Sequence, residues 1–204
     1  MEDKRGVSVI LSGVGGQGLR IASRILGEAS IRAGFDVKIR ESHGLAQREG
    51  SVVSHVRIGG VHSFMIPRGT AQALVSLELL EGARNISYLK KGGLAVLNDK
   101  LLYPVSYYAE ELPYPDREEI ISIFEQHKVN YVLINAESIA KRAGDLRSAN
   151  IVMLGVLAAF NVLPFHPKFV LEAVRSVIPY LTDVNVRAFE LGIEAARLVG
   201  YETE

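Results

Sequence analysis

Short apolar runs alternate along this chain with segments whose apolar residues recur at helical spacing. The first run, residues 7–12, is rich in β-branched side chains and bounded by Gly, which predicts a buried strand. Residues 19–33 then repeat apolar side chains every three or four positions, which predicts a helix that Gly34 can end. Further strands are predicted at 35–41, 51–58, 73–77, 94–98 and 131–135, and further helices at 79–89, 118–127, 136–143, 151–160, 168–176 and 185–198.

Segment 51–58 alternates strictly, so its even-numbered residues share one face of a strand. Gly59-Gly60 fits a turn, and residues 61–66 are predicted to return beside that strand as an antiparallel hairpin at one edge of the sheet. Strands that alternate with helices favour a mostly parallel sheet with helices on both faces. We therefore expect one Rossmann-like α/β domain over residues 1–204, with an antiparallel edge hairpin and a helical C-terminal part.

Composition narrows the function classes. The chain carries 23 basic and 23 acidic residues, so no global positive field favours nucleic acid or an anionic membrane. It has no Cys, which excludes disulfides, thiolate zinc sites, cysteine nucleophiles and iron–sulfur clusters ligated in the usual way. The charged N-terminus lacks the apolar stretch of a signal peptide, and the longest apolar run, 151–160, is too short for a membrane span. We expect a cytoplasmic protein that binds neither nucleic acid nor membrane.

Isolated polar residues offer little further chemistry. His55 and His62 have no metal-ligand spacing with each other or with His43, so no metal site is expected. Asn150 stands directly before an apolar helical run and is interpreted as the N-cap of that helix.

A Gly-rich turn follows the first strand and precedes the first helix. Gly13, Gly15 and Gly18 match G-x-G-x-x-G, in which Gly allows a tight bend, a close approach of ligand to backbone and close helix–strand packing. The N–H groups at the start of the helix then favour an anion. Glu41, about twenty residues further on, stands where a dinucleotide fold binds a ribose. One interpretation is NAD or FAD binding; the other is a tight junction without a ligand.

Two segments extend the candidate site beyond the three glycines. Gly16 and Gln17 add another Gly and a polar side chain that can reach a ligand or a facing subunit. The loop after the second strand lies at the carboxyl edge of the sheet, where ligands collect in doubly wound folds. This histidine loop, residues 42–50, is rich in polar groups, and we favour a binding or interface role over a surface loop held by its own hydrogen bonds. Its candidate residues are His43, Gln47 and Arg48.

Three stretches together resemble the small subunit of 2-oxoacid:ferredoxin oxidoreductases: GVGGQG at 13–18, SHGLAQR at 42–48 and SVVSHVR at 51–57. Within that family the chain is most similar to the beta subunits of indolepyruvate oxidoreductases, and the pyruvate and ketoisovalerate enzymes have a related gamma subunit. The resemblance covers nearly the whole chain, and NIVMLG at 150–155 fits a later helix of the family. Glu49 departs from the pattern, because the family usually has Gly there.

The resemblance implies a role in oxidative decarboxylation of a 2-oxoacid, with indolepyruvate or another aryl pyruvate as substrate, coenzyme A as co-substrate and ferredoxin as electron acceptor. That chemistry needs thiamine diphosphate, Mg²⁺ and iron–sulfur clusters. The chain has no Cys and no G-D-G element followed by a suitably spaced Asn, so the resemblance implies that a large partner subunit carries these cofactors. We expect this chain to bind none of them alone, to be inactive alone, to meet ferredoxin only indirectly and to be able to form a homodimer when isolated.

The same resemblance implies that the Gly-rich turn and the histidine loop face the large subunit near its thiamine and coenzyme A sites. The alternatives are a self-sufficient NAD- or FAD-dependent dehydrogenase and a non-catalytic module that binds a nucleotide or coenzyme A. No catalytic residue is assigned. The candidate cofactor-binding or interface residues are Gly13, Gly15, Gly16, Gln17, Gly18, His43, Gln47 and Arg48. A second candidate partner surface, which can equally cover the domain's own core, comprises Tyr103, Tyr107, Tyr108 and Tyr114.

Overall fold

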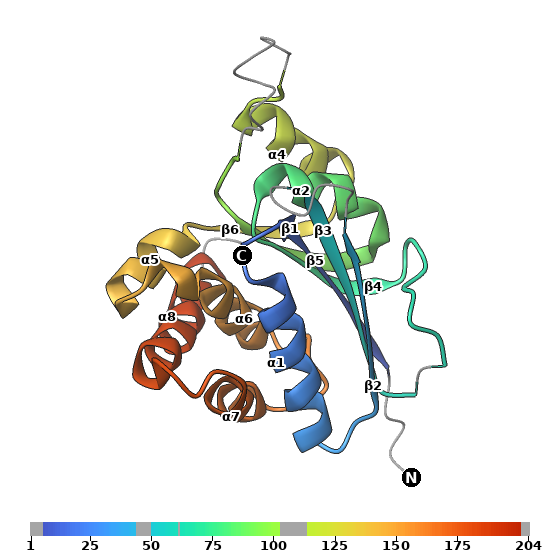
Figure 1. Cartoon of the computed structure of the whole chain (residues 1–204). Helices are drawn as coiled ribbons and strands as arrows, with labels where there is room; N and C mark the ends of the chain where they lie inside the picture. The colour runs from blue at the N-terminus through green and yellow to red at the C-terminus, as the bar shows by residue number, and fades with distance from the viewer. Residues whose placement is uncertain (1–5, 44–49, 61, 103–113, 201–204) are drawn as a thin grey trace.

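The computed structural model describes residues 6–43, 50–60, 62–102 and 114–200, and it contains one six-stranded sheet with helices on both faces (Figure 1). The strands are β1 (Val7–Val14), β2 (Val37–His43), β3 (Ser51–Ile58), β4 (Ala71–Ser76), β5 (Leu89–Asn98) and β6 (Asn130–Ile134). The α-helices are α1 (Leu19–Arg32), α2 (Leu79–Asn85), α4 (Arg117–Gln126), α5 (Ala136–Ala143), α6 (Ala149–Ala159), α7 (Lys168–Val177) and α8 (Thr182–Gly200). Two short 3₁₀ helices are η1 (Ile86–Tyr88) and η2 (Leu146–Ser148).

The strand order is β2-β3-β1-β4-β5-β6. Strands β1, β4, β5 and β6 are mutually parallel, whereas β3 runs antiparallel to both of its neighbours. The predicted α/β fold, with a mostly parallel sheet and an antiparallel pair at one edge, is therefore confirmed. Among the described residues, no helix is both long and apolar enough to cross a bilayer.

The predicted partner of β3 was wrong. The edge pair is β2–β3, with Val37 opposite Ile58, and residues 62–66 form no strand. Gly59 and Gly60 both have positive φ, at 75° and 56°, and direct the chain away from β3. Ile66 then buries its side chain in a core cluster on one face of the sheet, and its N–H donates to Nδ1 of His55 at 3.2 Å. Burial of Ile66 therefore holds this segment over the sheet instead of beside it.

The predicted helix 79–89 also ends early. Helix α2 stops at Asn85, η1 follows, and β5 already begins at Leu89, upstream of the predicted break at Lys91-Gly92-Gly93. Gly92 has a φ of 71°, and the register against β4 shifts between Ala71 and Ala73. A β-bulge thus absorbs the Gly-rich stretch within the strand, because bulges accommodate residues with positive φ.

The sheet separates two apolar cores. The first core lies under α1 and the helices α5 to α8, which cover one face in Figure 1. The second lies under α2, η1 and α4 on the opposite face. In β1, alternate side chains such as Leu11 and Ile10 enter the first and the second core respectively, as the pleat of a strand requires.

Candidate functional site

A cleft of about 440 Å³ opens at the carboxyl edge of the parallel strands. Helix α1, which follows β1, packs on the first core, whereas α2, which follows the neighbouring β4, packs on the second. The edge between β1 and β4 is therefore a topological switch point, where open α/β sheets bind ligands. The cleft is lined by Gly16, Gln17, Gly18, Ile21, Leu77, Asn98, Lys100, Glu137, Leu146, Arg147, Ala149 and Asn150.

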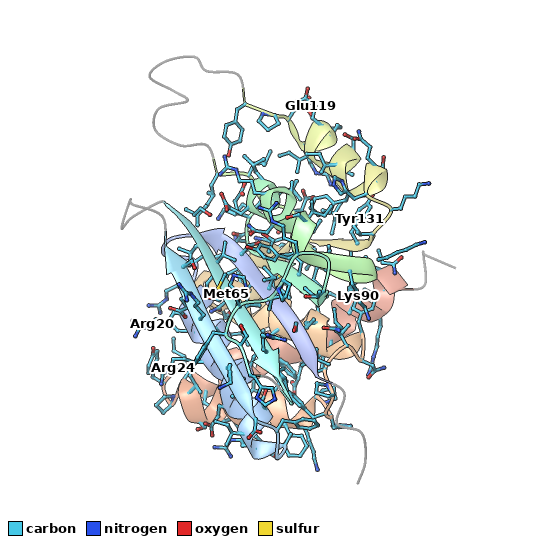
Figure 2. All side chains as sticks on the ribbon, turned by 90° about the vertical axis from the view of Figure 1, so that its right-hand side faces the viewer. Arg20, Arg24, Met65, Lys90, Glu119 and Tyr131 are labelled. Carbon is cyan, nitrogen blue, oxygen red and sulfur yellow. The ribbon has the colours of Figure 1, made fainter. Side chains whose placement is uncertain are left out.

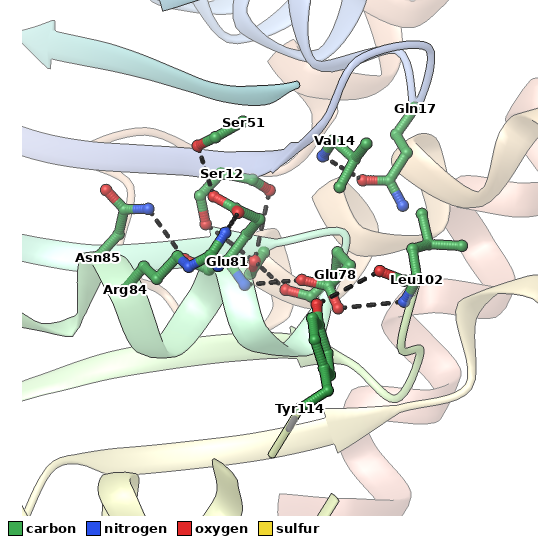
Figure 3. A network of polar contacts seen from close by, with 11 residues as sticks. Ser12, Val14, Gln17, Ser51, Glu78, Glu81, Arg84, Asn85, Leu102 and Tyr114 are labelled. Atoms are coloured by element: carbon green, nitrogen blue, oxygen red, sulfur yellow. Dashed lines mark hydrogen bonds and ion pairs between the residues drawn. The ribbon is translucent and has the colours of Figure 1, made fainter. Parts of the chain in front are cut away.

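Gln17 holds the Gly-rich turn against the end of β4. Its Oε1 accepts the Val14 N–H at 2.7 Å (Figure 3), and its Nε2 donates to the Leu77 carbonyl at 2.9 Å. A Cβ on Gly13 would lie 2.6 Å from that Oε1, so Gly13 leaves the space into which Gln17 folds. Gln17 was predicted to reach a ligand or a facing subunit; in the structure it lines the cleft while its amide binds this chain.

Asn150 joins α6 to the other end of the turn. Its Nδ2 donates to the Gly18 carbonyl at 3.0 Å. Gly18 has a φ of 80°, and a Cβ there would lie 2.6 Å from Nδ2 of Asn150. The N-cap prediction for Asn150 was wrong, because Ser148 is the N-cap residue and Asn150 lies in the first turn of α6. An Asn before an apolar run gives the same sequence signal in both roles, so sequence reasoning missed this contact.

Gly16 is the exposed point of the turn. It has a φ of 97°, and a Cβ there would meet nothing within 4 Å. Gly18, the N-cap residue of α1, makes no side-chain cap, so the described chain leaves this helix start without a capping side chain. A helix N-terminus beside open space favours an anionic group. This part of the turn therefore offers access to a ligand or a partner, whereas Gln17 and Gly18 fix its shape.

The histidine loop ends against the same turn. The Gly15 N–H donates to the carbonyl of Gly50, the last residue of the loop, at 2.9 Å. His43 is the last residue of β2 and lies opposite Val52 of β3. Gln47 and Arg48 lie outside the described residues. Their predicted place beside the Gly-rich turn therefore stays a prediction.

Glu41 does not occupy the ribose-binding position of a dinucleotide fold. Strand β3 separates β2 from β1, so the end of β2 is not adjacent to the Gly-rich turn in the sheet. Glu41 Oε1 instead accepts a hydrogen bond from Ser23 Oγ at 2.9 Å, one turn past the start of α1. The inserted antiparallel strand is the reason why sequence spacing misplaced this carboxylate.

The far wall of the cleft consists of compensated charges. Lys100 Nζ lies 2.6 Å from Oε1 of Glu137, and Arg147 pairs with Asp145 at 2.7 Å. Hydrogen bonds from Arg147 hold the pKa of Asp145 below its ordinary value. Asn98 donates to the Leu77 carbonyl at 3.0 Å and accepts the Ala136 N–H at 3.0 Å, which fixes the start of α5. These groups suit binding and positioning better than proton transfer.

A buried acidic network lies behind the turn, at the start of α2 (Figure 3). Glu78 is 1% exposed; its two carboxylate oxygens accept the Glu81 N–H at 2.7 Å and the Leu102 N–H at 3.3 Å. Burial raises the pKa of Glu78, and those hydrogen bonds oppose the rise. Glu81 accepts a hydrogen bond from Ser51 Oγ at 2.6 Å and pairs with Arg84. The network thus fixes the residues next to residues 44–49 and 103–113.

Glu78 and Glu81 were not among the residues expected at the site. The available signal was their spacing of three residues at a helix start, which is typical of capping. Of the four tyrosines proposed as a partner surface, Tyr103, Tyr107 and Tyr108 lie outside the described residues. Tyr114 packs against the second core, and its hydroxyl donates to the Leu102 carbonyl at 3.3 Å, so this side chain covers the protein's own core.

The described residues contain no group of three or more His, Asp or Glu side chains placed to hold a metal ion.

The chain matches the family model described as pyruvate ferredoxin/flavodoxin oxidoreductase over residues 8–195. It is 39% identical over 193 residues to an indolepyruvate oxidoreductase subunit IorB from Thermococcus kodakarensis, covering 93% of this chain and 96% of the relative. A ketoisovalerate oxidoreductase subunit VorA from Methanothermobacter thermautotrophicus is 26% identical over 194 residues, covering 94% of this chain and 36% of the relative.

Solved structures show the same fold. The gamma subunit of a keto/oxoacid ferredoxin oxidoreductase from Geobacter sulfurreducens aligns with a TM-score of 0.70 and 25% identity, covering 94% of this chain and 99% of that one. A 2-oxoglutarate:ferredoxin oxidoreductase from Magnetococcus marinus aligns with a TM-score of 0.71 and 22% identity, covering 96% of this chain and 32% of that one. Fold and length are thus those of a small oxidoreductase subunit. The chain belongs to the pyruvate ferredoxin/flavodoxin oxidoreductase family, which confirms the resemblance inferred from its motifs.

Proposed function

We propose that this chain, as one domain over residues 1–204, is the small subunit of a cytoplasmic complex that oxidatively decarboxylates indolepyruvate or a related aryl pyruvate. In that reaction coenzyme A takes up the acyl group, carbon dioxide leaves and ferredoxin takes up the electrons. The observation that carries the proposal is the 39% identity to a curated indolepyruvate oxidoreductase subunit over 96% of that relative's length. Thiamine diphosphate, Mg²⁺ and the iron–sulfur clusters would belong to the large subunit, since this chain has no Cys.

Within that complex, the carboxyl edge of the sheet would face the large subunit near its thiamine and coenzyme A sites. Support comes from the uncovered Gly16 beside the start of α1, because a helix N-terminus favours phosphate. Gln17 and Asn150 would keep the turn in a fixed shape without touching the ligand, since both amides bind this chain. Arg48 of the histidine loop would supply a cation for a phosphate or a carboxylate.

The dinucleotide alternative loses support from the topology. A self-sufficient NAD- or FAD-dependent enzyme needs a carboxylate on the ribose, and Glu41 is bound to Ser23 on α1 instead. A non-catalytic module that binds coenzyme A alone would not need a large subunit, so association with one separates the two alternatives from the proposal.

The first experiment mixes the chain with the large thiamine-containing subunit of the same organism and measures the mass of the product by size exclusion with light scattering. We expect a complex of fixed stoichiometry, whereas the isolated chain should show no calorimetric binding of NAD or FAD. Tight binding of either dinucleotide by the isolated chain, together with no complex, would defeat the proposal.

A second experiment tests the role assigned to the carboxyl edge. Arg48→Ala should raise the apparent KM for coenzyme A of the reconstituted complex or weaken its assembly, because it removes a cation from this edge. Lys168→Ala is the control, since this exposed residue lies on α7, which does not line the cleft. Equal behaviour of the two variants in both assays would remove Arg48 from the site.

A further inference from the structure

Strand β2 is an open edge of the sheet. It pairs with β3 on one side, and in the described part of the chain no strand pairs with its other side. An edge strand presents backbone N–H and C=O groups that a further strand can use. The opposite edge is β6, which gives the same molecule a second open edge for comparison.

Cations lie on both sides of the β2 edge. On the face of the second core, β2 carries Lys38 and the exposed Arg40, and Arg57 of β3 lies directly opposite Lys38. On the face of the first core, α1 carries Arg20 and Arg24, one helical turn apart and both exposed. Figure 2 shows these two arginines projecting beside the outer strand of the sheet. The edge therefore lies between two groups of positive charge.

Helix α1 keeps its arginines close to β2 through two contacts. Ser23 binds Glu41 of β2 at 2.9 Å, and a Cβ on Gly27 would lie 2.7 Å from Cδ1 of Ile39. Because Arg20 and Arg24 occupy the side of α1 next to Ser23 and Gly27, they follow the edge strand.

Glu41, which binds Ser23 of α1, is the acidic residue of β2, and the cations of this edge outnumber it. None of Arg20, Arg24 and Arg40 forms an ion pair within the described part of the chain. Nearby Glu28 is bound to Arg32 at 2.7 Å. The whole chain has 23 residues of each sign, so the local excess of cations at this edge comes from their placement and not from composition. Strand β6 itself carries no charged residue, whereas β2 carries Lys38, Arg40 and Glu41.

We infer that β2 is a docking edge for the large subunit, which adds an acidic extended segment as a further strand. The inference rests on the proposed function, because that function supplies the partner. Charge complementarity selects an acidic occupant, since the exposed Arg20, Arg24 and Arg40 would face it. A second copy of this chain is a poor occupant, because pairing two β2 strands would bring their Lys38 and Arg40 side chains together.

The test measures hydrogen–deuterium exchange of this chain, free and in complex with the large subunit. Backbone amides of β2 should exchange at least about tenfold more slowly in the complex, because strand addition gives them hydrogen-bond partners. Amides of β6 should not change, and they are the control within the same sample. A complex in which β2 gains no protection would overturn the docking edge and leave the proposed function standing. Failure to form any complex would overturn both.

Charge variants test whether the cations of the β2 edge serve docking or only keep the open edge from aggregating. Arg20→Glu/Arg24→Glu should weaken the complex about tenfold and remove much of the salt dependence of its association rate. Arg20→Glu places a carboxylate in the first turn of α1, where it is favourable, and both positions are exposed, so the variant should fold. Lys90→Glu/Lys91→Glu changes the net charge equally at exposed positions of β5 and should leave the affinity within about twofold. Equal weakening by both double variants would contradict the inference.

Discussion

The two faces of the sheet are covered by different kinds of packing. On the first face α6 is buried almost throughout and packs against α8, and five helices in all contribute to that core. On the second face two α-helices and η1 cover the sheet, and the ionisable side chains that are buried in the described chain, His55, Glu78 and Glu81, all lie on this side. The first face therefore depends on close apolar packing. The second face combines apolar packing with buried polar groups that bind the segments near the cleft.

The largest expected effect tests whether the second face can loosen alone. Phe124→Ala removes a side chain with 0% exposure from α4 and should destabilise the protein by about 4 kcal/mol. Hydrogen exchange should accelerate in α2 and α4 more than in α6 and α8. Phe189→Ala on α8, with 1% exposure, is the matched control and should accelerate exchange in both cores. Uniform acceleration in Phe124→Ala would contradict the difference between the faces.

A second change tests the packing of the first face. A Cβ on Gly192 would lie 2.2 Å from the Val152 carbonyl oxygen, so Gly192→Ala forces α6 and α8 apart. Denaturant unfolding should show a loss of about 3 kcal/mol. In Gly27→Ala the new methyl meets only the side-chain tip of Ile39, at 2.7 Å, and the gain in helix propensity should keep the change below about 1 kcal/mol. Similar losses of stability in both variants would show that the close contact of Gly192 with the Val152 backbone does not cause the destabilisation.

These particular residues show what a sequence can predict. Local periodicity predicted β1, α1 and α5 closely, because their apolar spacing matches their burial. It misplaced residues 62–66, since the choice between a hairpin and a buried Ile66 depends on contacts with the second core. The same limit applies to Asn150, whose partner Gly18 is 132 residues away. The glycines of the turn were recognisable in the sequence. The hydrogen bond from Gln17 that fixes the turn was not, because its acceptor is the carbonyl of Leu77 in a distant segment.

A smaller loss of stability is expected from a substitution in the Gly-rich turn, which lies at the cleft. Gln17→Ala removes the acceptor for Val14 N–H and the donor for Leu77 O, so stability should fall by about 2 kcal/mol. Gln17→Glu keeps the acceptor but sets a carboxylate oxygen against the Leu77 carbonyl oxygen, so its loss in thermal or denaturant unfolding should be at least as large. If both variants were as stable as the wild type, the two hydrogen bonds of the Gln17 side chain would not hold the turn.

The smallest effect is a pH dependence that belongs to the second face. Burial, with a contribution from the positive charge of Arg40, lowers the pKa of His55 below its ordinary 6.5. The unfolded chain therefore binds a proton more readily than the fold, and stability should fall as pH decreases from about 6.5 toward the lowered pKa. His55→Gln should remove that part of the slope, on the order of 1 kcal/mol or less. The raised pKa of Glu78 has the opposite effect on the pH dependence of stability, because the folded protein holds that proton more tightly than the unfolded chain. Glu78 is present in both the wild type and His55→Gln, so its contribution cancels when the pH profile of one is subtracted from that of the other.

The most direct test of the account is the reaction of the reconstituted complex. Ferredoxin reduction with indolepyruvate and coenzyme A would be measured for the large subunit alone, for this chain alone and for mixtures of rising ratio. The account predicts no reaction with this chain alone, and a rate that rises as the chain is added and saturates at the stoichiometry of the complex. Full activity of the large subunit without this chain, unchanged when the chain is added, would contradict it.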